Sequence, residues 1–169
     1  MSKLTVERAQ ELHGRHNGIS IPVDIETLAI TEGCELIDWP FIEPVKEVKQ
    51  GRFIGIASGL EKRERRHLIA HALAHHLLHC GNQLAFSQHW KGEPARQERE
   101  AEECAAHILM PAQELEKVIM SSVWELADYF DVPTELAYQR ISIYAAREEL
   151  ERWDNILYDS NSGYKGESL

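Results

Sequence analysis

Long hydrophobic runs are missing from this sequence. No apolar stretch approaches the roughly 20 residues that a helix needs to cross a membrane, so we expect no membrane-spanning segment. Residues 1–18 form a polar helical pattern and lack the short basic segment and apolar block that mark a secretory signal. We therefore expect the protein to be cytoplasmic.

Cysteine and basic residues are also scarce. The three cysteines, Cys34, Cys80 and Cys104, are widely spaced and form no CxxC pair, which favours buried reduced thiols over a disulfide framework. Lys and Arg number 18 against 28 Asp and Glu, and the formal net charge is −10. A broad nucleic-acid surface requires clustered basic side chains, so this balance argues against one. We expect the partner to be a protein.

The residues that are present fit a globular domain with a real core. Hydrophobic residues make up 43% of the 169. Apolar residues at helical spacing, bounded by capping and terminating residues, predict helices at 6–16, 24–33, 61–80, 94–110, 112–120, 122–129 and 133–149. Two runs rich in β-prone residues, at 34–39 and 51–57, predict strands of one small antiparallel sheet.

A row of histidines on one predicted helix is the densest group of metal-binding side chains. In the segment HALAH, His71 and His75 are four residues apart, so both imidazoles point the same way and can share one metal ion. A lone pair of this kind is more often an ordinary feature of a helix. Here it lies in mid-helix in an apolar context and is followed by a helix rich in carboxylates, which favours a metal site.

Tetrahedral zinc needs a third protein ligand and an open position. The predicted helix at 94–110 supplies carboxylates at helical spacing, namely Glu98, Glu100, Glu102 and Glu103. Glu98 and Glu102 share a face one turn apart, so one of them can bind the ion while the other orients a ligand imidazole.

Two motifs resemble a known family. Residues 66–79, RHLIAHALAHHLLH, are similar to the "RxxxAHELxHxLLH" helix of the ImmA/IrrE metallopeptidases, and residues 98–111, EREAEECAAHILMP, to their "ExxANxFAxxLLMP" helix. The segment IPVDI at 21–25 resembles the family's "PVD" segment, so the resemblance covers roughly residues 5–120. It implies that His71, His75 and Glu98 are the zinc ligands. Glu102 stands where the family often has Asn, and Cys104 where it often has Phe.

The catalytic glutamate of such peptidases is missing. It follows the first histidine and takes a proton from the attacking water, but this chain has Ala72 there. Loss of a general base typically costs about 10² to 10⁴ in rate, so we expect the chain to be nearly inert. His79 lies two helical turns further on, about 10 Å away, which is too far to replace it. Ala72 is either an engineered substitution, which the intact ligands favour, or the mark of a natural pseudoenzyme.

The C-terminal third carries a further motif. The segment VWELADYFDVP at 123–133, followed by Arg140 and Ile141, resembles the "LAxxFxVP…RL" pattern of the same family and a helix-turn-helix element. A DNA-reading helix needs basic side chains, whereas 133–149 contains acidic residues beside its two arginines. We therefore expect core packing or protein docking, with Trp124, Tyr129 and Phe130 buried.

The sequence thus predicts an α+β fold, with a small antiparallel sheet beside a zincin-like pair of helices and a helical C-terminal part. We expect residues 1–120 to form the metallopeptidase domain, 121–158 a helical extension of the same unit, and 159–169 a disordered tail. Peptidases often bind substrate as an added strand, and the run 51–57 is the strand that we expect to receive it.

The resemblance implies a zinc-dependent endopeptidase that cleaves a helix-turn-helix transcriptional repressor, inactivated here by Ala72. The alternative is a non-catalytic protein-binding regulator that retains the fold. Zinc is the expected cofactor because two imidazoles and a carboxylate suit it, although manganese or iron can take similar ligands. Neither nucleic acid nor membrane is an expected partner.

Overall fold

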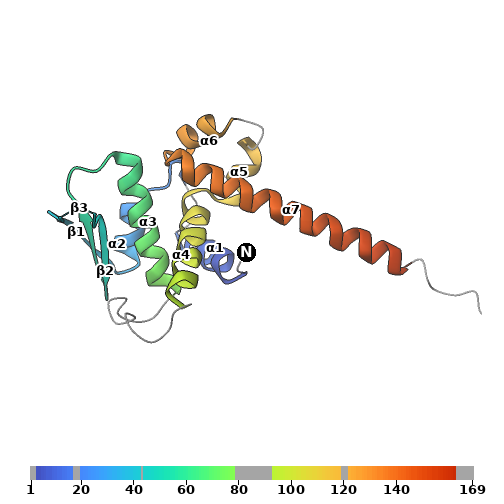
Figure 1. Ribbon diagram of the computed structural model, residues 1–169, viewed down its shortest axis with the longest axis horizontal. Helices are drawn as coiled ribbons and strands as arrows, with labels where there is room; N and C mark the ends of the chain where they lie inside the picture. Colours follow the sequence, from blue (N-terminus) through green and yellow to red (C-terminus); the bar gives the residue numbers. More distant parts are fainter. Residues whose placement is uncertain (1–2, 17–19, 43, 79–92, 119–121, 163–169) are drawn as a thin grey trace, which may run out of the picture.

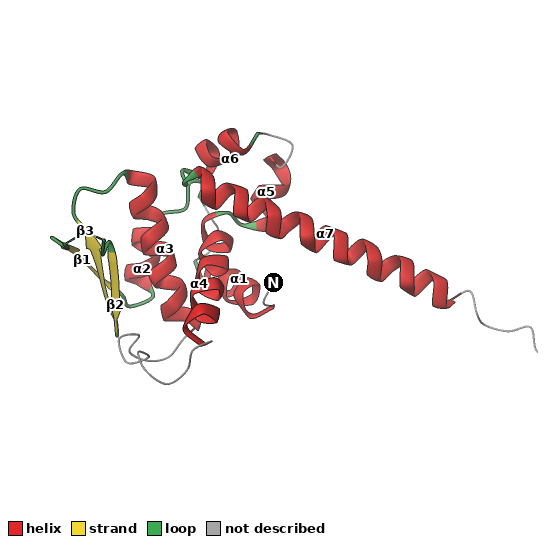
Figure 2. Ribbon diagram, in the orientation of Figure 1, coloured by secondary structure: helices red, strands yellow, loops and turns green. Residues whose placement is uncertain are grey.

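The computed structural model describes residues 3–16, 20–42, 44–78, 93–118 and 122–162. Its elements, in chain order, are α1 (Lys3–Arg15), α2 (Ile25–Thr31), β1 (Glu35–Trp39), β2 (Glu47–Gln50), β3 (Phe53–Ala57), α3 (Lys62–Leu78), α4 (Glu93–Leu109), α5 (Ala112–Val118), α6 (Val123–Phe130) and α7 (Thr134–Ser162). The α+β class and the helical C-terminal part are confirmed (Figure 1; Figure 2).

The sheet is mixed rather than wholly antiparallel, which corrects our prediction. Its strand order is β1-β3-β2, with β1 parallel to β3 and β2 antiparallel to β3. The sequence prediction missed β2 because this strand has four residues, EVKQ, and no alternation of apolar and polar side chains. A tight turn with Gly51 at a φ of +58° joins β2 to β3, so β2 takes the antiparallel place and β1 pairs with the other edge of β3.

Helix α3 is the centre of the molecule. The sheet and α2 lie on one side of it and α4 on the other, with α1 packed against α4 (Figure 2). Glu61 starts α3 by accepting hydrogen bonds from the backbone N–H groups of Arg63 and Glu64. The apolar side chains between these layers are fully buried, among them Ile54, Ile56, Ile69, Leu73, Ala101, Ala105 and Ile108.

The side chains of Arg140 and His13 bind the C-terminal end of α4. The Nε–H of Arg140, on α7, donates to the carbonyl oxygen of Met110 at 3.0 Å, and His13 Nε2, on α1, lies 2.9 Å from the carbonyl oxygen of Ile108. The last carbonyls of a helix have no partner within the helix, so these contacts satisfy groups that burial would otherwise penalise. They fasten α1 and α7 to α4.

Asp131 joins the C-terminal helices to α3. It ends α6 in a left-handed conformation at φ 54°, after Ser122 and Glu125 have formed a capping box at the start of that helix. Its carboxylate makes ion pairs with Lys62, at 2.6 Å, and with Arg66, at 3.4 Å, in the first turns of α3. The corner between α6 and α7 is therefore tied to the beginning of the central helix.

Several predictions about the C-terminal part need correction. Phe130 is buried as expected, but Trp124 is 69% exposed and Tyr129 is 40% exposed, because α6 is short and turns one face to solvent. Helix α7 continues to residue 162 and extends away from the other elements (Figure 1). The predicted tail at 159–169 therefore begins inside a helix, and its last seven positions, 163–169, lie outside the described residues.

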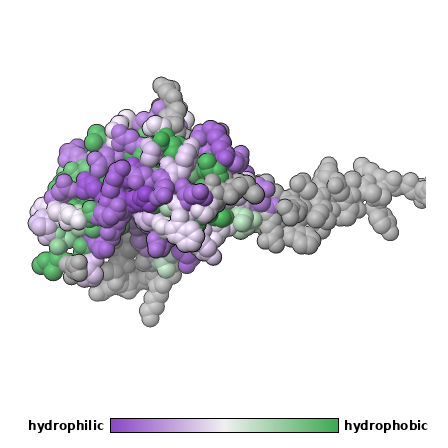
Figure 3. All heavy atoms as spheres, turned by 90° about the horizontal axis from the view of Figure 1, so that it is seen from above, coloured by the Kyte–Doolittle hydropathy of each residue, from purple (hydrophilic) through white to green (hydrophobic). Residues whose placement is uncertain are grey.

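The two cysteines that the structure describes are buried, as the sequence analysis predicted. Cys34 and Cys104 are buried free thiols, and Cys80 lies outside the described residues. On the face shown in Figure 3, hydrophilic residues cover most of the described surface and hydrophobic residues form small separate groups. Within the described ranges, no helix is both long enough and apolar enough for a membrane crossing.

We expect the protein to lose stability in mild acid because of His107 on α4. Burial, together with the positive charges of Arg140, Arg147 and His13, lowers the pKa of His107 to about 3. In the unfolded chain the imidazole titrates near its usual value of about 6.5. Below that pH the unfolded state binds a proton that the folded state does not. Between the two pKa values the free energy of unfolding should therefore fall by about 1.4 kcal/mol per pH unit.

Urea unfolding at about pH 7.5 and about pH 5.5 measures this loss. The His107→Leu variant has a side chain of similar size that cannot titrate, so it should lose about 1 kcal/mol less than the parent over the same interval. Equal losses in the two proteins would show that the acid sensitivity arises elsewhere.

Candidate metal centre

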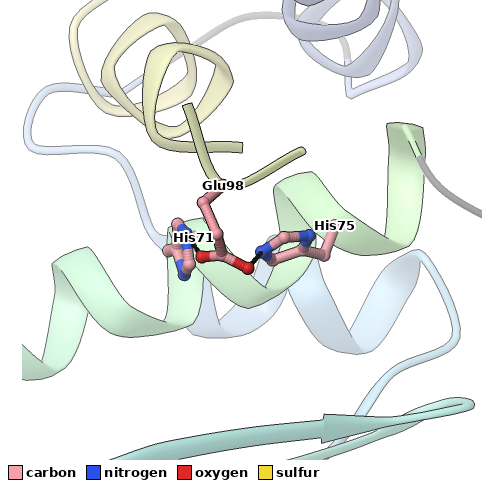
Figure 4. A group of neighbouring side chains, drawn as sticks. All are labelled: His71, His75 and Glu98. Atoms are coloured by element: carbon pink, nitrogen blue, oxygen red, sulfur yellow. Dashed lines mark ion pairs between the residues drawn. The ribbon is translucent and has the colours of Figure 1, made fainter. Parts of the chain in front are cut away.

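The two histidines of the HALAH segment and Glu98 meet between α3 and α4. His71 and His75 lie one turn apart on α3, and the Glu98 carboxylate reaches from α4 to a position between their rings (Figure 4). One oxygen of Glu98 is 3.4 Å from His71 Nε2 and the other is 3.4 Å from His75 Nε2. One ligand atom from each residue can be chosen so that all three lie within 4.8 Å of one another.

This spacing fits a single metal ion. Donor atoms bound to one tetrahedral zinc at about 2.1 Å lie roughly 3.4 Å apart, which matches both pairs of atoms. The rings of His71 and His75 are nearly perpendicular, with centroids 4.6 Å apart, so both Nε2 atoms can face one point. Two imidazole nitrogens and one carboxylate oxygen are a standard set of protein ligands for catalytic zinc.

The site is buried on the side of α3 and open on the side of α4. The His75 side chain is 3% exposed and that of His71 is 17% exposed, whereas that of Glu98 is 59% exposed. A surface groove of about 470 Å³ opens beside them, lined by His71, Glu98, Arg99, Glu102, Glu103, Gln139 and Ile143. The groove leaves room for a fourth ligand or a substrate, as a catalytic rather than a structural metal site requires.

Glu47 is a candidate site residue that the sequence analysis missed. It lies on β2, and its carboxylate is 3.2 Å from Nδ1 of His71, on the opposite side of the ring from Glu98. A carboxylate that accepts the Nδ1–H of a ligand histidine fixes the ring so that Nε2 faces the metal. No apolar pattern marks β2, so only the folded chain brings Glu47 to His71.

The carboxylates also shape the charge of the site. Burial alone would lower the pKa of His71, but the hydrogen bonds with Glu47 and Glu98 outweigh it and raise the pKa to about 10. The hydrogen bond with His71 is in turn the main cause of the lowered pKa of Glu98. The cluster is therefore arranged to hold positive charge between two carboxylates.

Glu102 has a different partner from the one we expected. It lines the same groove, but its carboxylate is 2.9 Å from Nε2 of His67, which lies one turn before His71 on α3. Helices α3 and α4 run in opposite directions here. Glu102, one turn after Glu98 on α4, therefore lies opposite His67, one turn before His71 on α3. The carboxylate that contacts Nδ1 of His71 is that of Glu47.

Ala72 is fully buried in the turn of α3 between the two histidines. Its methyl group can neither accept nor donate a proton. Of the other carboxylates of the site, Glu47 binds His71 and Glu102 binds His67. His79 lies outside the described residues. Nothing in the described part of the site takes the place of the absent glutamate.

Two histidines one turn apart with a carboxylate from the next helix define a site of the metallopeptidase type. Comparison with known families matches residues 41–142 to the IrrE N-terminal-like domain, and the chain belongs to this peptidase-type family. The ImmA/IrrE resemblance of the two helical motifs is thereby confirmed, and the family is typically metal-dependent. The matched region continues past residue 120 through α6 into α7.

A solved structure supports the fold. The chain is similar to a Mycobacterium tuberculosis transcriptional regulator, with a TM-score of 0.62 and 17% sequence identity over 84% of this chain. The similar region is 47% of that regulator, so this chain spans about half of its length. A comparison with curated proteins finds no match.

We expect Glu47 to control metal affinity. Purified protein dialysed against a weak chelator should retain about one zinc per chain, and His75→Ala should lose it, because only three protein ligands hold the ion. The Glu47→Gln variant keeps the three ligands but removes the carboxylate that orients His71, so its zinc affinity should fall about 10- to 100-fold.

Glu102→Gln is the matched control. It also removes one carboxylate charge beside a histidine of α3, but from a residue that contacts His67 and not His71, so we expect a much smaller change in zinc affinity. Titration with a competing zinc indicator measures the zinc affinity of the parent, of Glu47→Gln and of Glu102→Gln. Equal losses in Glu47→Gln and Glu102→Gln would mean that net charge, and not orientation of His71, sets the affinity.

Proposed function

We propose that this chain is the zinc-binding domain of an endopeptidase that cleaves a helix-turn-helix transcriptional repressor, in a form that lacks its general base. The observation that carries the proposal is the complete set of ligand atoms from His71, His75 and Glu98 around one point, with Ala72 in the turn between the histidines. Zinc is favoured because this donor set suits it, and the cytoplasm is the compartment where such a repressor acts.

In this proposal each residue of the site has a separate role in peptide hydrolysis. Bound zinc would polarise the scissile carbonyl and activate a water molecule. His71 and His75 supply imidazole nitrogens, Glu98 supplies an oxygen, and Glu47 keeps His71 in the correct orientation. What is missing is a group that accepts a proton from the water and passes it to the leaving amine. Position 72 would carry that group.

The strand that would receive an extended substrate is β2, not the run 51–57 that we first expected. Strand β3 covers 53–57 and is paired on both sides, so its backbone groups are already used. Within the described sheet β2 is an edge strand, and it carries Glu47 beside the metal ligands. A peptide added along β2 would have its backbone held by the sheet and its scissile bond close to the zinc.

We expect Ala72→Glu to create metal-dependent proteolysis. A general base contributes about 10² to 10⁴ in rate, so the variant should cleave the helix-turn-helix repressor encoded nearest to this chain that many times faster than the parent. Cleavage products are measured by gel and mass spectrometry, with and without chelator. Ala72→Gln is the matched control, since it has the same shape and no basic carboxylate.

Because Ala72 is fully buried, thermal melting and zinc content of both variants should be measured first. A folded, zinc-loaded Ala72→Glu protein that is no faster than Ala72→Gln would contradict the endopeptidase proposal.

The second candidate function is a non-catalytic regulator that binds a protein. Two observations favour it, namely Ala72 itself and the exposed aromatic side chains of Trp124 and Tyr138 on α6 and α7, which are 69% and 68% exposed. Such residues are common at protein interfaces. This regulator would bind its partner equally well with His71 intact or replaced, whereas a peptidase-type substrate site would not.

A further inference from the structure

The sheet has two faces, and the described helices lie on only one side of it (Figure 2). On that side, Ile54 and Ile56 of β3 are fully buried against the helices. Side chains alternate along a strand, so Phe53 and Gly55 belong to the opposite face. The opposite face is therefore the one that the described helices leave uncovered.

Strand pairing brings more apolar residues to this uncovered face. Ile37 of β1 and Val48 of β2 are both paired with Gly55, so the three residues form one row across the sheet. Trp39 lies two residues after Ile37 on β1 and therefore points the same way. All three strands thus contribute apolar side chains to one surface.

Phe41 packs on the same surface. A β-carbon built on Gly55 would lie 3.2 Å from the ring of Phe41, so the ring rests directly against the backbone of β3. It fills the place of the side chain that glycine lacks. We call the surface formed by Ile37, Trp39, Phe41, Val48 and Phe53 the outer sheet face.

The exposed apolar area at this end of the molecule is large enough for a protein interface. Ile42 and Val45 lie next to the outer sheet face, between Phe41 and β2. The exposed fractions are 39% for Ile37, 55% for Trp39, 88% for Ile42, 44% for Val45 and 43% for Phe53. These side chains together expose roughly 500 Å² of apolar surface, and patches of that size are often functional. Two such patches in contact would bury about 1,000 Å², which is the lower limit for a specific interface.

The charged side chains beside the outer sheet face are paired within the chain. They form three ion pairs at 2.5–2.7 Å, namely Glu35–Arg52, Asp38–Arg65 and Lys46–Glu64. Positive and negative charge are therefore balanced around the apolar residues, although the whole chain has a net charge of −10. A strongly basic partner would be attracted to other parts of the chain. The surface that matches a neutral apolar face bordered by charges of both signs is a second copy of the same face.

We propose that two copies of this chain associate through their outer sheet faces. The two sheets pack face to face around a two-fold axis, so that the same residues make contact in both copies. Trp39 and Phe53 are the aromatic anchors of the interface. Glu47 points to the opposite side of the sheet, towards His71, so the dimer leaves the candidate metal centre open. Association depends neither on metal nor on peptidase activity.

Sedimentation velocity of the full chain at about 10 to 500 μM tests the proposal, because the small interface predicts a weak dimer. Reducing agent and chelator are present, so that neither a disulfide nor a shared metal ion joins two copies. We expect the average mass to rise from one chain towards two chains as the concentration increases.

The salt dependence of the mass identifies the kind of interface. Two copies with a net charge of −10 repel each other, and salt screens this repulsion. Association through an apolar face should therefore become stronger between about 0.05 and 0.5 M NaCl. Association that becomes weaker with salt would mean that ion pairs join the copies, and would overturn the proposal.

Two substitutions test the location of the interface. Ile37→Lys places a charge in the centre of the outer sheet face and should lower the dimer affinity about tenfold or more. Trp39→Gln removes an anchor without changing the charge and should lower the affinity in the same direction. Circular dichroism and thermal melting show whether both variants are folded.

Leu4→Lys is the matched control. Leu4 lies on α1, away from the sheet, and is 40% exposed, so the variant makes the same change in charge at a similarly exposed aliphatic residue (Figure 1). Its dimer affinity should equal that of the parent. A chain that stays monomeric over the whole concentration range overturns the proposal. A dimer that persists in both Ile37→Lys and Trp39→Gln, or that Leu4→Lys weakens equally, also overturns it, because the copies would then meet at another surface.

Discussion

The antiparallel packing of α3 against α4 is the contact on which the rest of the structure depends. Both helices bury small and branched apolar residues at 0% exposure, including Ala70, Leu73, Ala101 and Ala105. Two helices packed in opposite directions align one turn of the first with one turn of the second. That alignment sets Glu98 opposite His71 and His75, and Glu102 opposite His67. A shift of α4 by one turn would move Glu98 away from its position between His71 and His75.

The two ends of α4 differ in the charge of their surroundings. Near its beginning, carboxylates surround imidazoles, which suits a cation. Near its end, burial and the neighbouring positive charges, that of Arg140 first, lower the pKa of His107, so this imidazole is neutral at neutral pH. The elements that support each end also differ, since β2 supports the first through Glu47, and α1 and α7 support the second through His13 and Arg140. The two ends of α4 are therefore held by different parts of the fold.

Ala72 determines what this member of the family can do chemically. With alanine at position 72, the candidate ligand atoms are at distances that one metal ion would bridge. Alanine is the best helix former and leaves α3 continuous through the site. With this residue the chain keeps the arrangement of His71, His75 and Glu98, and position 72 itself offers no side chain that could accept a proton.

Local spacing explains how much of this protein could be predicted. A four-residue interval on a helix places two side chains on the same face, so the metal-binding geometry of His71 and His75 on α3 could be predicted. The two helical motifs likewise predicted α3, α4 and the family. Glu98 was one of four carboxylates by spacing, and the family motif selected it. Other features have no local signal. The exposure of Trp124 depends on which side of the short α6 meets the core, and hydrophobicity alone does not specify that.

The sequence by itself determined the fold class, the two helices and the identity of the three candidate ligands. Only the tertiary structure decided the strand order, the pairing of Glu47 with His71 and of Glu102 with His67, and the burial of His107. The physical reason is the distance along the chain over which each interaction acts. Helical periodicity acts within one turn, whereas each of these contacts joins residues far apart in the chain that meet only when the helices and the sheet have packed.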